Sequence, residues 1–361
     1  MSARPLRVLH LLNTVRETGN GIINTAVDLA WGQARLGHEV QVASGGGEFA
    51  SRLAEWGITH HALDQRRGPL TLLRAARRLR ALLAELRPDV VHAHMMTGAV
   101  LARAVRQPRA YGGPLLVGHV HNVYQRSARL MAVADVVLCC GTAVAATMRA
   151  RGTAPERLRV VLNGTVGSPR LPNAATVAPA ALSHPAIVTV AGMNARKGID
   201  ELLQAFERVA ARHAGAHLYL VGDGPERARF ETIARAGAAA DRVHFTGFLR
   251  DPMPHLRAAD LFVLASRRES FPIVIGEARA AACAIVATDV DGVRESLDGG
   301  RAGVLVPPRD AVALADAIGH LLDDPAQRAR QAAAAREGLE HYRVERMVAE
   351  TVALYREALA C

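Results

Sequence analysis

Residues 260–277 read DLFVLASRRESFPIVIGE. They contain a strand-like apolar run, a polar loop and the start of a helical pattern, a sequence of elements that recurs along the chain. The apolar run DLFVLAS is typical of a strand buried on both faces of a parallel sheet. A short polar loop follows, and Pro272 then suits the first turn of a helix. Glu269 in the loop and Glu277 in the helix flank amides that would form a helix N-terminus, a ready phosphate site. A capped helix with two solvated acids explains the same residues equally well.

The same alternation of apolar runs and helical patterns occurs along the whole chain. The other strand-like runs are RVLHLL, EVQVAS, DVVHAH, PLLVGHV and DVVLCC, then AIVTVAG, HLYLVGDG, RVHFTG and AIVATDV. Helical patterns occupy about residues 22–36, 70–86, 199–213, 227–238, 272–283, 311–322 and 325–341. This alternation predicts an α/β protein with two doubly wound, Rossmann-like domains and a cleft between them. Ligands of such sheets bind at the carboxyl ends of the strands.

The length and composition support two domains. A chain of 361 residues exceeds what one hydrophobic core usually supports. Residues 165–185 lack periodicity and predict the linker. We therefore expect one domain over residues 1–168, a second over 169–345, and a C-terminal helix over 346–361. No apolar run reaches the ~20 residues of a membrane span, and the four cysteines have no metal-like or paired spacing, which favours a cytoplasmic protein.

The net charge of +10 is unevenly distributed. Up to Arg170 the chain has 22 arginines against 10 acids, whereas the remainder has 22 basic residues against 24 acids. An anionic substrate or an anionic membrane surface explains this excess. Nucleic acid is not expected, because aromatic residues are scarce and not interleaved with the arginines. Residues 70–86 place Arg74, Arg77 and Arg78 beside an apolar stripe, which suits an anionic bilayer or, equally, a core-facing helix with a charged surface.

Lys197, in the loop NARKGID, is the only lysine of the chain, while 43 residues are arginine. A solvated loop would accept arginine, so a solitary lysine indicates a site that needs a compact ammonium. Together with Arg196 it could neutralise a diphosphate leaving group as its charge develops. A basic loop ended by Gly198 is the alternative.

Two weaker signals lie in the first half. Asn20 and Gly21 precede a helical pattern, where a small residue allows an anion to approach the backbone, or simply makes a tight turn. Histidines end two strands, as His92 and His94 and as His119 and His121. Strand alternation places each pair on one face, but no carboxylate accompanies them, so we expect no metal site. One strand-end histidine would contact substrate, and His119 would be a hydrogen-bonded core residue.

In the second half, the motif GDGPER lacks the third glycine of a dinucleotide fingerprint, so a nicotinamide-dependent dehydrogenase is not expected.

In combination, these loops resemble family 4 of the retaining glycosyltransferases, which have the two-domain GT-B fold. The resemblance covers nearly the whole chain. It runs through GNGIINTAVDLA, DVVHAH, VHN, VVLNG, KGIDELLQAF, LVGDGPER, VHFTGFLRD, ESFPIVIGEA and AGVLVPPRD. Each piece is weak alone, whereas the Glu-x7-Glu signature with KG and GDGP upstream is specific in combination.

The resemblance implies roles for the matching residues. His121 matches the histidine near the reacting sugar, Lys197 the donor-diphosphate lysine, and Glu269 the acid that holds the sugar hydroxyls; these three would be catalytic. Glu277 matches the acid that binds the nucleotide ribose. The remaining donor-binding positions are Asn20, Gly21, Arg196, Ser270, Phe271, Pro272, Ile273 and Val274. The family uses no cofactor or metal, and the leaving phosphate itself helps to activate the acceptor.

The chain departs from the family pattern at several positions. Gly192-Met193 stands where the family has Gly-Arg, so Arg196 would be the displaced second cation. Pro272 replaces a glycine and removes one backbone donor, and Asn20 replaces the first glycine of the N-terminal pair. Both acids and the lysine remain, so an active enzyme is expected.

The predicted function is therefore transfer of a hexosyl group, with retention, from a nucleotide diphosphate sugar to a glycan or lipid-linked glycan. Such an enzyme would serve cell-envelope or exopolysaccharide biosynthesis, in the cytoplasm or peripherally at the inner face of the membrane. The N-terminal domain would receive the acceptor, the second domain would bind the donor, and the last helix would cross back to the first. A nucleotide-sugar epimerase or phosphorylase of the same fold, or a non-catalytic nucleotide-sugar-binding protein, are the alternatives.

Overall fold

The computed structural model describes residues 4–66, 68–171 and 176–360, and its contacts divide the chain into two compact units. Unit 1 comprises Met1–Gly164 and Arg343–Cys361, and unit 2 comprises Thr165–Tyr342. The divisions thus fall after residues 164 and 342, beside the boundaries at 168 and 345 that the sequence suggested. The interval 165–185 has no helix or strand among its described residues and is grouped with unit 2.

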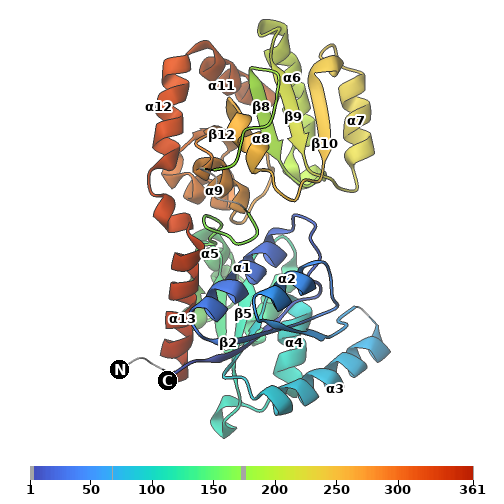
Figure 1. The fold of residues 1–361 in the computed structure, drawn as a ribbon, viewed down its shortest axis with the longest axis vertical. Coiled ribbons are helices and arrows are strands. Elements are labelled where there is room, and N and C mark those ends of the chain that lie inside the picture. Colours follow the sequence, from blue (N-terminus) through green and yellow to red (C-terminus); the bar gives the residue numbers. More distant parts are fainter. Residues whose placement is uncertain (1–3, 67, 172–175, 361) are drawn as a thin grey trace. The chain divides into compact units, whose positions relative to one another are not determined.

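Unit 1 has a seven-stranded parallel sheet in the order β3-β2-β1-β4-β5-β6-β7 (Figure 1). Its strands are β1 (Arg7–Leu11), β2 (Glu39–Ser44), β3 (Thr59–Ala62), β4 (Val90–Ala93), β5 (Leu115–Val120), β6 (Val136–Cys139) and β7 (Leu158–Val160). Its helices are α1 (Gly21–Arg35), α2 (Phe49–Glu55), α3 (Pro69–Leu86), α4 (Met96–Val105), α5 (Thr142–Ala150) and α13 (Val344–Ala360). The last helix packs on α1, where a Cβ at Gly32 would lie 2.4 Å from the Val348 side chain. This close approach requires glycine.

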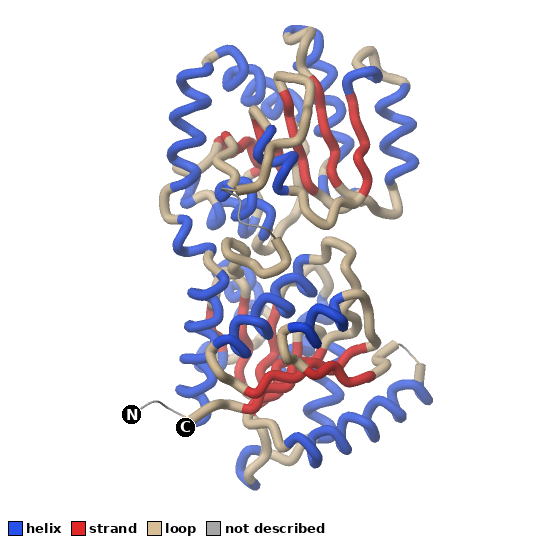
Figure 2. The backbone as a smooth tube through the Cα atoms, in the orientation of Figure 1, coloured by secondary structure: helices blue, strands red, loops and turns tan. Residues whose placement is uncertain are grey.

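Unit 2 has a six-stranded parallel sheet in the corresponding order β10-β9-β8-β11-β12-β13. Its strands are β8 (Ala186–Val190), β9 (His217–Val221), β10 (Val243–Gly247), β11 (Leu261–Leu264), β12 (Ala284–Thr288) and β13 (Val304–Val306). Its helices are α6 (Ile199–Arg212), α7 (Arg227–Arg235), α8 (Met253–Ala258), α9 (Ile273–Ala280), α10 (Asp291–Ser296), α11 (Ala311–Asp323) and α12 (Pro325–Arg336). Within each unit, helices cover the strands (Figure 2). Strand order reverses beside β1 and beside β8, and ligands of doubly wound sheets bind at these switch points.

The α/β fold class predicted from the sequence is confirmed, while several element bounds differ. Strands β3, β7 and β13 were not recognised, because edge strands are short or half-exposed and lack a continuous apolar run. The helix expected over 325–341 ends at Arg336, since Gly338 adopts a φ of +70°. Likewise the helix expected over 272–283 ends at Ala280, and Ala282 adopts a φ of +61°. None of the described helices is long and apolar enough to cross a membrane.

Candidate active site

The lysine loop of unit 2 follows β8 and lies against the loop after β11. Gly198 ends this loop with a φ of +65°, and a Cβ there would lie 1.9 Å from the carbonyl oxygen of Ala265. Glycine is therefore required both by the backbone conformation and by the close packing. The backbone of Arg267 in turn donates to the carbonyl of Arg196 at 2.8 Å. Because β8 and β11 are neighbours, the two loops meet at the switch point of the sheet.

Three polar side chains converge on one carboxylate oxygen at this point. Glu269 is 5% exposed, and its Oε1 accepts hydrogen bonds from the Lys197 ammonium and from the Ser266 hydroxyl, the latter at 2.9 Å. An Arg196 guanidinium nitrogen lies 3.3 Å from the same oxygen. Burying a carboxylate is unfavourable unless it is paired and hydrogen-bonded. Here two cations and a hydroxyl satisfy that requirement.

The electrostatics of the group keep Glu269 ionised. Burial by itself raises the pKa of the Glu269 carboxyl, because the interior solvates a charge poorly. The charges of Lys197 and Arg196, with hydrogen bonds from Lys197 and Ser266, outweigh burial and leave the pKa below its ordinary value. The site therefore holds a buried anion beside two cations.

The departures from the family pattern have visible consequences. Met193 is fully buried in the core of unit 2, so its side chain takes no part in the polar group. Arg196, three residues later, lies beside Lys197 on Glu269. Pro272 is the residue that precedes α9, with extended backbone, rather than part of its first turn.

The second acid of the signature is held separately. Glu277 lies in α9 and is 7% exposed, and its Oε1 accepts a hydrogen bond from the Thr165 hydroxyl at 3.1 Å. Thr165 also donates its backbone N–H to the carbonyl of Tyr342 at 2.8 Å. A Cβ at Gly276 would lie 2.8 Å from the Thr165 side chain, so glycine lets the helix approach this segment closely. The first and last residues of unit 2 thus join beside Glu277.

Between the two acids, residues 270–274 form the turn into α9. Ser270, Phe271, Pro272 and Val274 are buried, while Ile273 is half-buried. A Cβ at Gly292 would lie 1.7 Å from the carbonyl oxygen of Ser270, so the start of α10 packs directly on this turn. The first amides of α9 have no partner within the helix, as at any helix start. An oxygen ligand at this turn could therefore accept backbone hydrogen bonds.

The predicted residues of unit 1 lie at the carboxyl ends of its central strands. Asn20 is exposed, and its side-chain oxygen accepts from the backbone N–H of Ile22 at 2.9 Å, which caps α1. Gly21 is the first residue of that helix. His121 directly follows β5 and is 8% exposed.

Unit 1 also gathers a group of buried histidines, here called the histidine cluster: His10, His92, His94, His119 and His121. His92 and His94 stack at 4.4 Å, and His119 and His121 at 3.8 Å, which confirms that each pair shares one face. The prediction that His119 is hydrogen-bonded is wrong, because neither of its ring nitrogens has a partner among the described residues. Its ring is instead packed between other imidazoles. Two triplets of the cluster have nitrogens within 4.8 Å of one another, and neither triplet includes a carboxylate.

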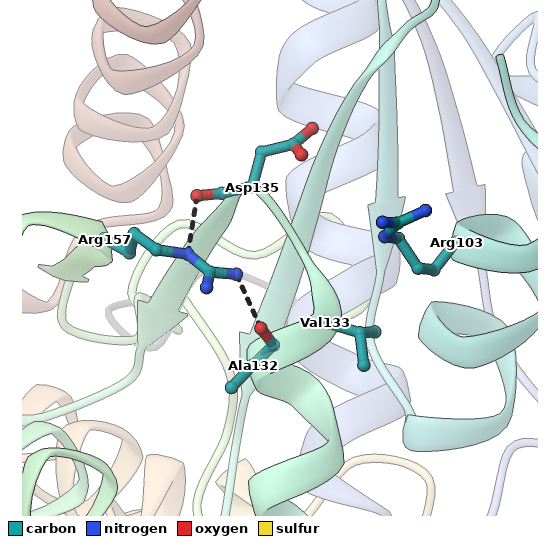
Figure 3. Close-up of a pocket in the computed structure, with 5 residues that line it drawn as sticks. All are labelled: Arg103, Ala132, Val133, Asp135 and Arg157. Carbon is teal, nitrogen blue, oxygen red and sulfur yellow. Dashed lines mark hydrogen bonds between the residues drawn. The ribbon is translucent and has the colours of Figure 1, made fainter. Parts of the chain in front are cut away.

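A pocket of about 730 Å³ lies elsewhere in unit 1, beside the starts of β6 and β7 (Figure 3). It is lined by Arg103, Ala132, Val133, Asp135 and Arg157. The Arg157 guanidinium donates to the carbonyls of Ala132 and Asp135, so it holds the wall of the pocket together (Figure 3). The pocket lies at the amino ends of the strands and includes none of the predicted site residues.

Comparisons with protein families and with known proteins identify the family of this chain. The family described as Glycosyltransferase Family 4 matches residues 19–165, and the family described as Glycosyl transferases group 1 matches residues 184–324. The glycogen synthase of Mycobacterium tuberculosis is 30% identical over 74% of this chain and 69% of its own length. The lipopolysaccharide core biosynthesis glycosyltransferase LpsD of Rhizobium meliloti is 32% identical over 73% of each chain. An alpha-D-kanosaminyltransferase of Streptomyces kanamyceticus is 35% identical, over 41% of this chain and 39% of that protein.

Solved structures identify the fold. A glycosyltransferase of Rickettsia africae matches 99% of both chains with a TM-score of 0.82 at 19% identity. HepE of Anabaena, solved with UDP and glucose, matches 96% of this chain and 99% of its own, also with a TM-score of 0.82 at 19% identity. The class defined by the two sheets is thus the GT-B fold of glycosyltransferases. Within that class, this chain belongs to glycosyltransferase family 4.

Several residues of the site were not found from the sequence. Ser266 and Thr165 bind the two acids, yet serine and threonine at such positions are common in any loop. Glu226 accepts a hydrogen bond from the backbone N–H of Ala195 and so supports the lysine loop. Only the position of Ser266 just after a strand carried a signal, because residues at strand ends approach the ligand site.

Proposed function

We propose that this glycosyltransferase moves a hexosyl group, with retention of configuration, from a nucleotide diphosphate sugar to a glycan or lipid-linked glycan acceptor. The observation that carries the proposal is the buried Glu269 carboxylate, held ionised beside Lys197 and Arg196 at the switch point of unit 2. A carboxylate there would accept hydrogen bonds from sugar hydroxyls. The two cations would stabilise the charge that develops on a diphosphate.

The reaction that fits these groups needs no protein nucleophile. The bond from the anomeric carbon to the diphosphate oxygen breaks, and the acceptor oxygen bonds to that carbon on the same face. The acceptor proton passes to the leaving phosphate. Lys197 and Arg196 would neutralise the diphosphate without a metal ion, and the first amides of α9 would bind sugar or phosphate oxygens.

Glu277 completes the donor site as the acid that would hold the ribose. It is buried, and the hydroxyl of Thr165 donates to its Oε1. Unit 1, with His121, Asn20 and Gly21, would receive the acceptor. The relatives support a role in cell-envelope or exopolysaccharide synthesis, since LpsD is named for lipopolysaccharide core biosynthesis. HepE was solved with UDP-glucose, which supports a nucleotide sugar as donor.

The decisive test is thermal stabilisation by nucleoside diphosphates, followed by their sugars. A ligand at 100 times its Kd stabilises the native state by about 2.7 kcal/mol, so the correct base raises the melting temperature clearly. Lys197→Met should lose most of this stabilisation, whereas Arg235→Met, at an exposed arginine that ends α7, should keep it. No response to any nucleotide would overturn the proposed donor.

Product analysis then separates the reaction classes. With donor and acceptor, we expect one new glycosidic bond with the anomeric configuration of the donor, and undiminished turnover in EDTA. Donor alone giving an epimerised nucleotide sugar would identify an epimerase. Turnover with inorganic phosphate and without a nucleotide would identify a phosphorylase. Binding without turnover of any tested donor and acceptor would favour a non-catalytic protein.

The acceptor side includes a candidate for contact with anionic membrane. Leu70 and Leu73 at the start of α3 are 68% and 47% exposed, and Arg74, Arg77 and Arg78 follow them on the surface. The rest of the apolar stripe faces the core, where Leu79 and Leu82 are buried. Exposed leucines beside arginines suit an anionic bilayer. Vesicles containing phosphatidylserine should retain the protein at low salt, and a variant with both exposed leucines changed to serine should be released. Absence of binding by the unaltered protein would remove the membrane from the proposal.

A further inference from the structure

The histidine cluster contains a continuous chain of hydrogen bonds between rings. In order, the Gln33 side chain contacts His10 Nε2 at 2.8 Å, His10 Nδ1 contacts His94 Nε2 at 2.9 Å, and His94 Nδ1 contacts His121 Nε2 at 3.1 Å. The register of the sheet explains this arrangement. His10 of β1 lies beside His92 of β4, so all these side chains point from neighbouring strands to the same face. Helices α1 and α13 cover that face, with Gln33 and Tyr355 respectively.

The rings of this chain are neutral. Burial lowers the pKa of His10 to about 4 and that of His121 to about 3, and it lowers the pKa of His94 well below its ordinary value. A neutral imidazole carries a single hydrogen, on one nitrogen or on the other. Each ring in the chain must therefore donate at one nitrogen and accept at the other. The direction of one bond fixes the direction of all the rest.

Gln33 supplies that direction. Its amide nitrogen donates to the Tyr355 hydroxyl oxygen at 3.2 Å, so its carbonyl oxygen faces His10 and can only accept. His10 must then carry its hydrogen on Nε2 and accept at Nδ1. His94 donates from Nε2 and accepts at Nδ1, and His121 donates from Nε2. The Nδ1 of His121 remains without a partner among the described residues, which fits the bare end of such a chain.

We propose that Gln33 is a positioning residue for His121: acting through His10 and His94, it fixes His121 as the tautomer with hydrogen on Nε2 and a bare acceptor at Nδ1. The consequence is a histidine with one defined hydrogen-bonding character at a strand end. A free imidazole would populate both tautomers and present a donor or an acceptor at random. The tautomer rests on the bonds described here, and its use in sugar transfer rests on the proposed function.

Nitrogen-15 NMR of the unmodified protein tests the tautomer directly, without any substrate. The one-bond N–H coupling and the nitrogen shifts show which ring nitrogen carries hydrogen, and a His121→Gln variant assigns the signals. We expect hydrogen on Nε2 of His121, His94 and His10 at pH 7. Hydrogen on Nδ1 of His121 would overturn the proposal, because the chain would then run in the opposite direction.

Variants test whether Gln33 is the cause. Gln33→Met removes the side-chain amide, both its oxygen and its nitrogen, at similar side-chain length, and His121 should then show a mixture of tautomers. Gln41→Met is the matched control, since Gln41 also binds a histidine, His61, in the same sheet but outside the chain. The control should leave His121 unchanged. A single unchanged tautomer in Gln33→Met would overturn the role of Gln33.

Two further measurements complete the test. Zinc added to the protein should not remain after gel filtration. If one equivalent of zinc stays bound and the N–H signals of the histidine rings disappear, the proposed chain of hydrogen bonds is wrong, because the metal would then occupy the nitrogen lone pairs that accept those bonds. In a transfer assay, Gln33→Met should lower kcat/KM about tenfold, the equivalent of one hydrogen bond. If Gln33→Met changes the tautomer of His121 in the NMR spectrum but does not lower kcat/KM, His121 has no role in the proposed reaction, whereas the tautomer assignment still holds.

Discussion

The two units of this chain have corresponding strand orders but differ in their most prominent groups of buried polar side chains. In unit 1 the central strands and the residues at their ends include five buried histidines, held neutral by burial, and three of them, His10, His94 and His121, are joined by ring-to-ring hydrogen bonds. In unit 2 the prominent groups are ion pairs: Lys197 and Arg196 pair with Glu269, and the fully buried Arg279 pairs with Asp298. Neutral groups suit a site that orients hydroxyls, whereas fixed charges suit one that binds a diphosphate.

The largest expected difference is in acid. The folded-state pKa values of the histidine cluster lie below the value of 6.5 for an exposed histidine, so the unfolded chain binds more protons as pH falls. The free energy of unfolding of unit 1 is therefore highest above about pH 6.5. As the pH falls from 6.5 to about 4, His10 and His121 should each lower it by about 1.4 kcal/mol per pH unit. In unit 2, by contrast, the pKa of the Glu269 carboxyl is lowered from its ordinary value of 4.5. The ionised carboxylate therefore stabilises the folded state above pH 4.5, and this stabilisation is lost only as the pH falls below that value.

Tryptophan fluorescence can follow this loss in unit 1 alone, because the two tryptophans of the chain, Trp31 and Trp56, both lie there. Titrating from pH 7 to pH 4, we expect the fluorescence transition to precede loss of the helical circular dichroism signal of unit 2. Coincident transitions at every pH would contradict the comparison.

The next largest effect concerns the buried arginine of unit 2. The Arg279 guanidinium donates to the carbonyls of Ala335 and Ser296 and pairs with Asp298. Arg279→Met removes the guanidinium that pairs with Asp298 and donates to the buried Ala335 carbonyl, and it should lower the free energy of unfolding of unit 2 by about 3–5 kcal/mol. Arg294→Met is the control, since the Arg294–Asp289 pair is exposed and solvent-exposed ion pairs contribute little to stability. Chemical denaturation followed by circular dichroism would show the difference, and equal effects of the two variants would contradict it.

A smaller effect, on activity and not on stability, is expected at Lys197. Its ammonium makes a compact contact with the buried Glu269, and a planar guanidinium does not reproduce that geometry. Lys197→Arg should lower kcat about 100-fold, the loss typical of one stabilising group in a transition state. The melting temperature should stay within a degree or two of the unaltered protein. Full activity in this variant would make the single lysine an accident of composition.

The smallest effect is expected at Thr165, whose hydroxyl donates a hydrogen bond to the Glu277 carboxylate. Thr165→Val removes the hydroxyl that donates to the Glu277 carboxylate while keeping the shape of the side chain. Loss of one hydrogen bond of about 1 kcal/mol should weaken binding of the nucleoside diphosphate about fivefold. Isothermal titration calorimetry measures this change, with Thr232→Val as the control, because Thr232 bonds only within α7. An unchanged Kd would show that Glu277 needs no positioning by Thr165.

Much of the fold could be predicted from this sequence, because buried parallel strands read as continuous apolar runs and glycine or proline punctuates the helices. The residues Glu269, Lys197 and Arg196 were also singled out, and the structure brings these three together. Their partners Ser266 and Thr165 were not found. A hydroxyl becomes informative only when the acid it serves is known to lie beside it, and neither spacing nor composition shows that.

The sequence by itself determined the order of strands and helices, the charged loop around Lys197 and the family to which the chain belongs. Each of these depends on neighbours along the chain and on residue type. The tertiary structure alone decided that His10, Gln33 and Tyr355, from β1, α1 and α13, form one hydrogen-bonded system with His121. Sheet register and helix packing bring these residues together across more than three hundred positions. Hydrogen bonds depend on distances of about 3 Å, which the linear order of residues does not contain.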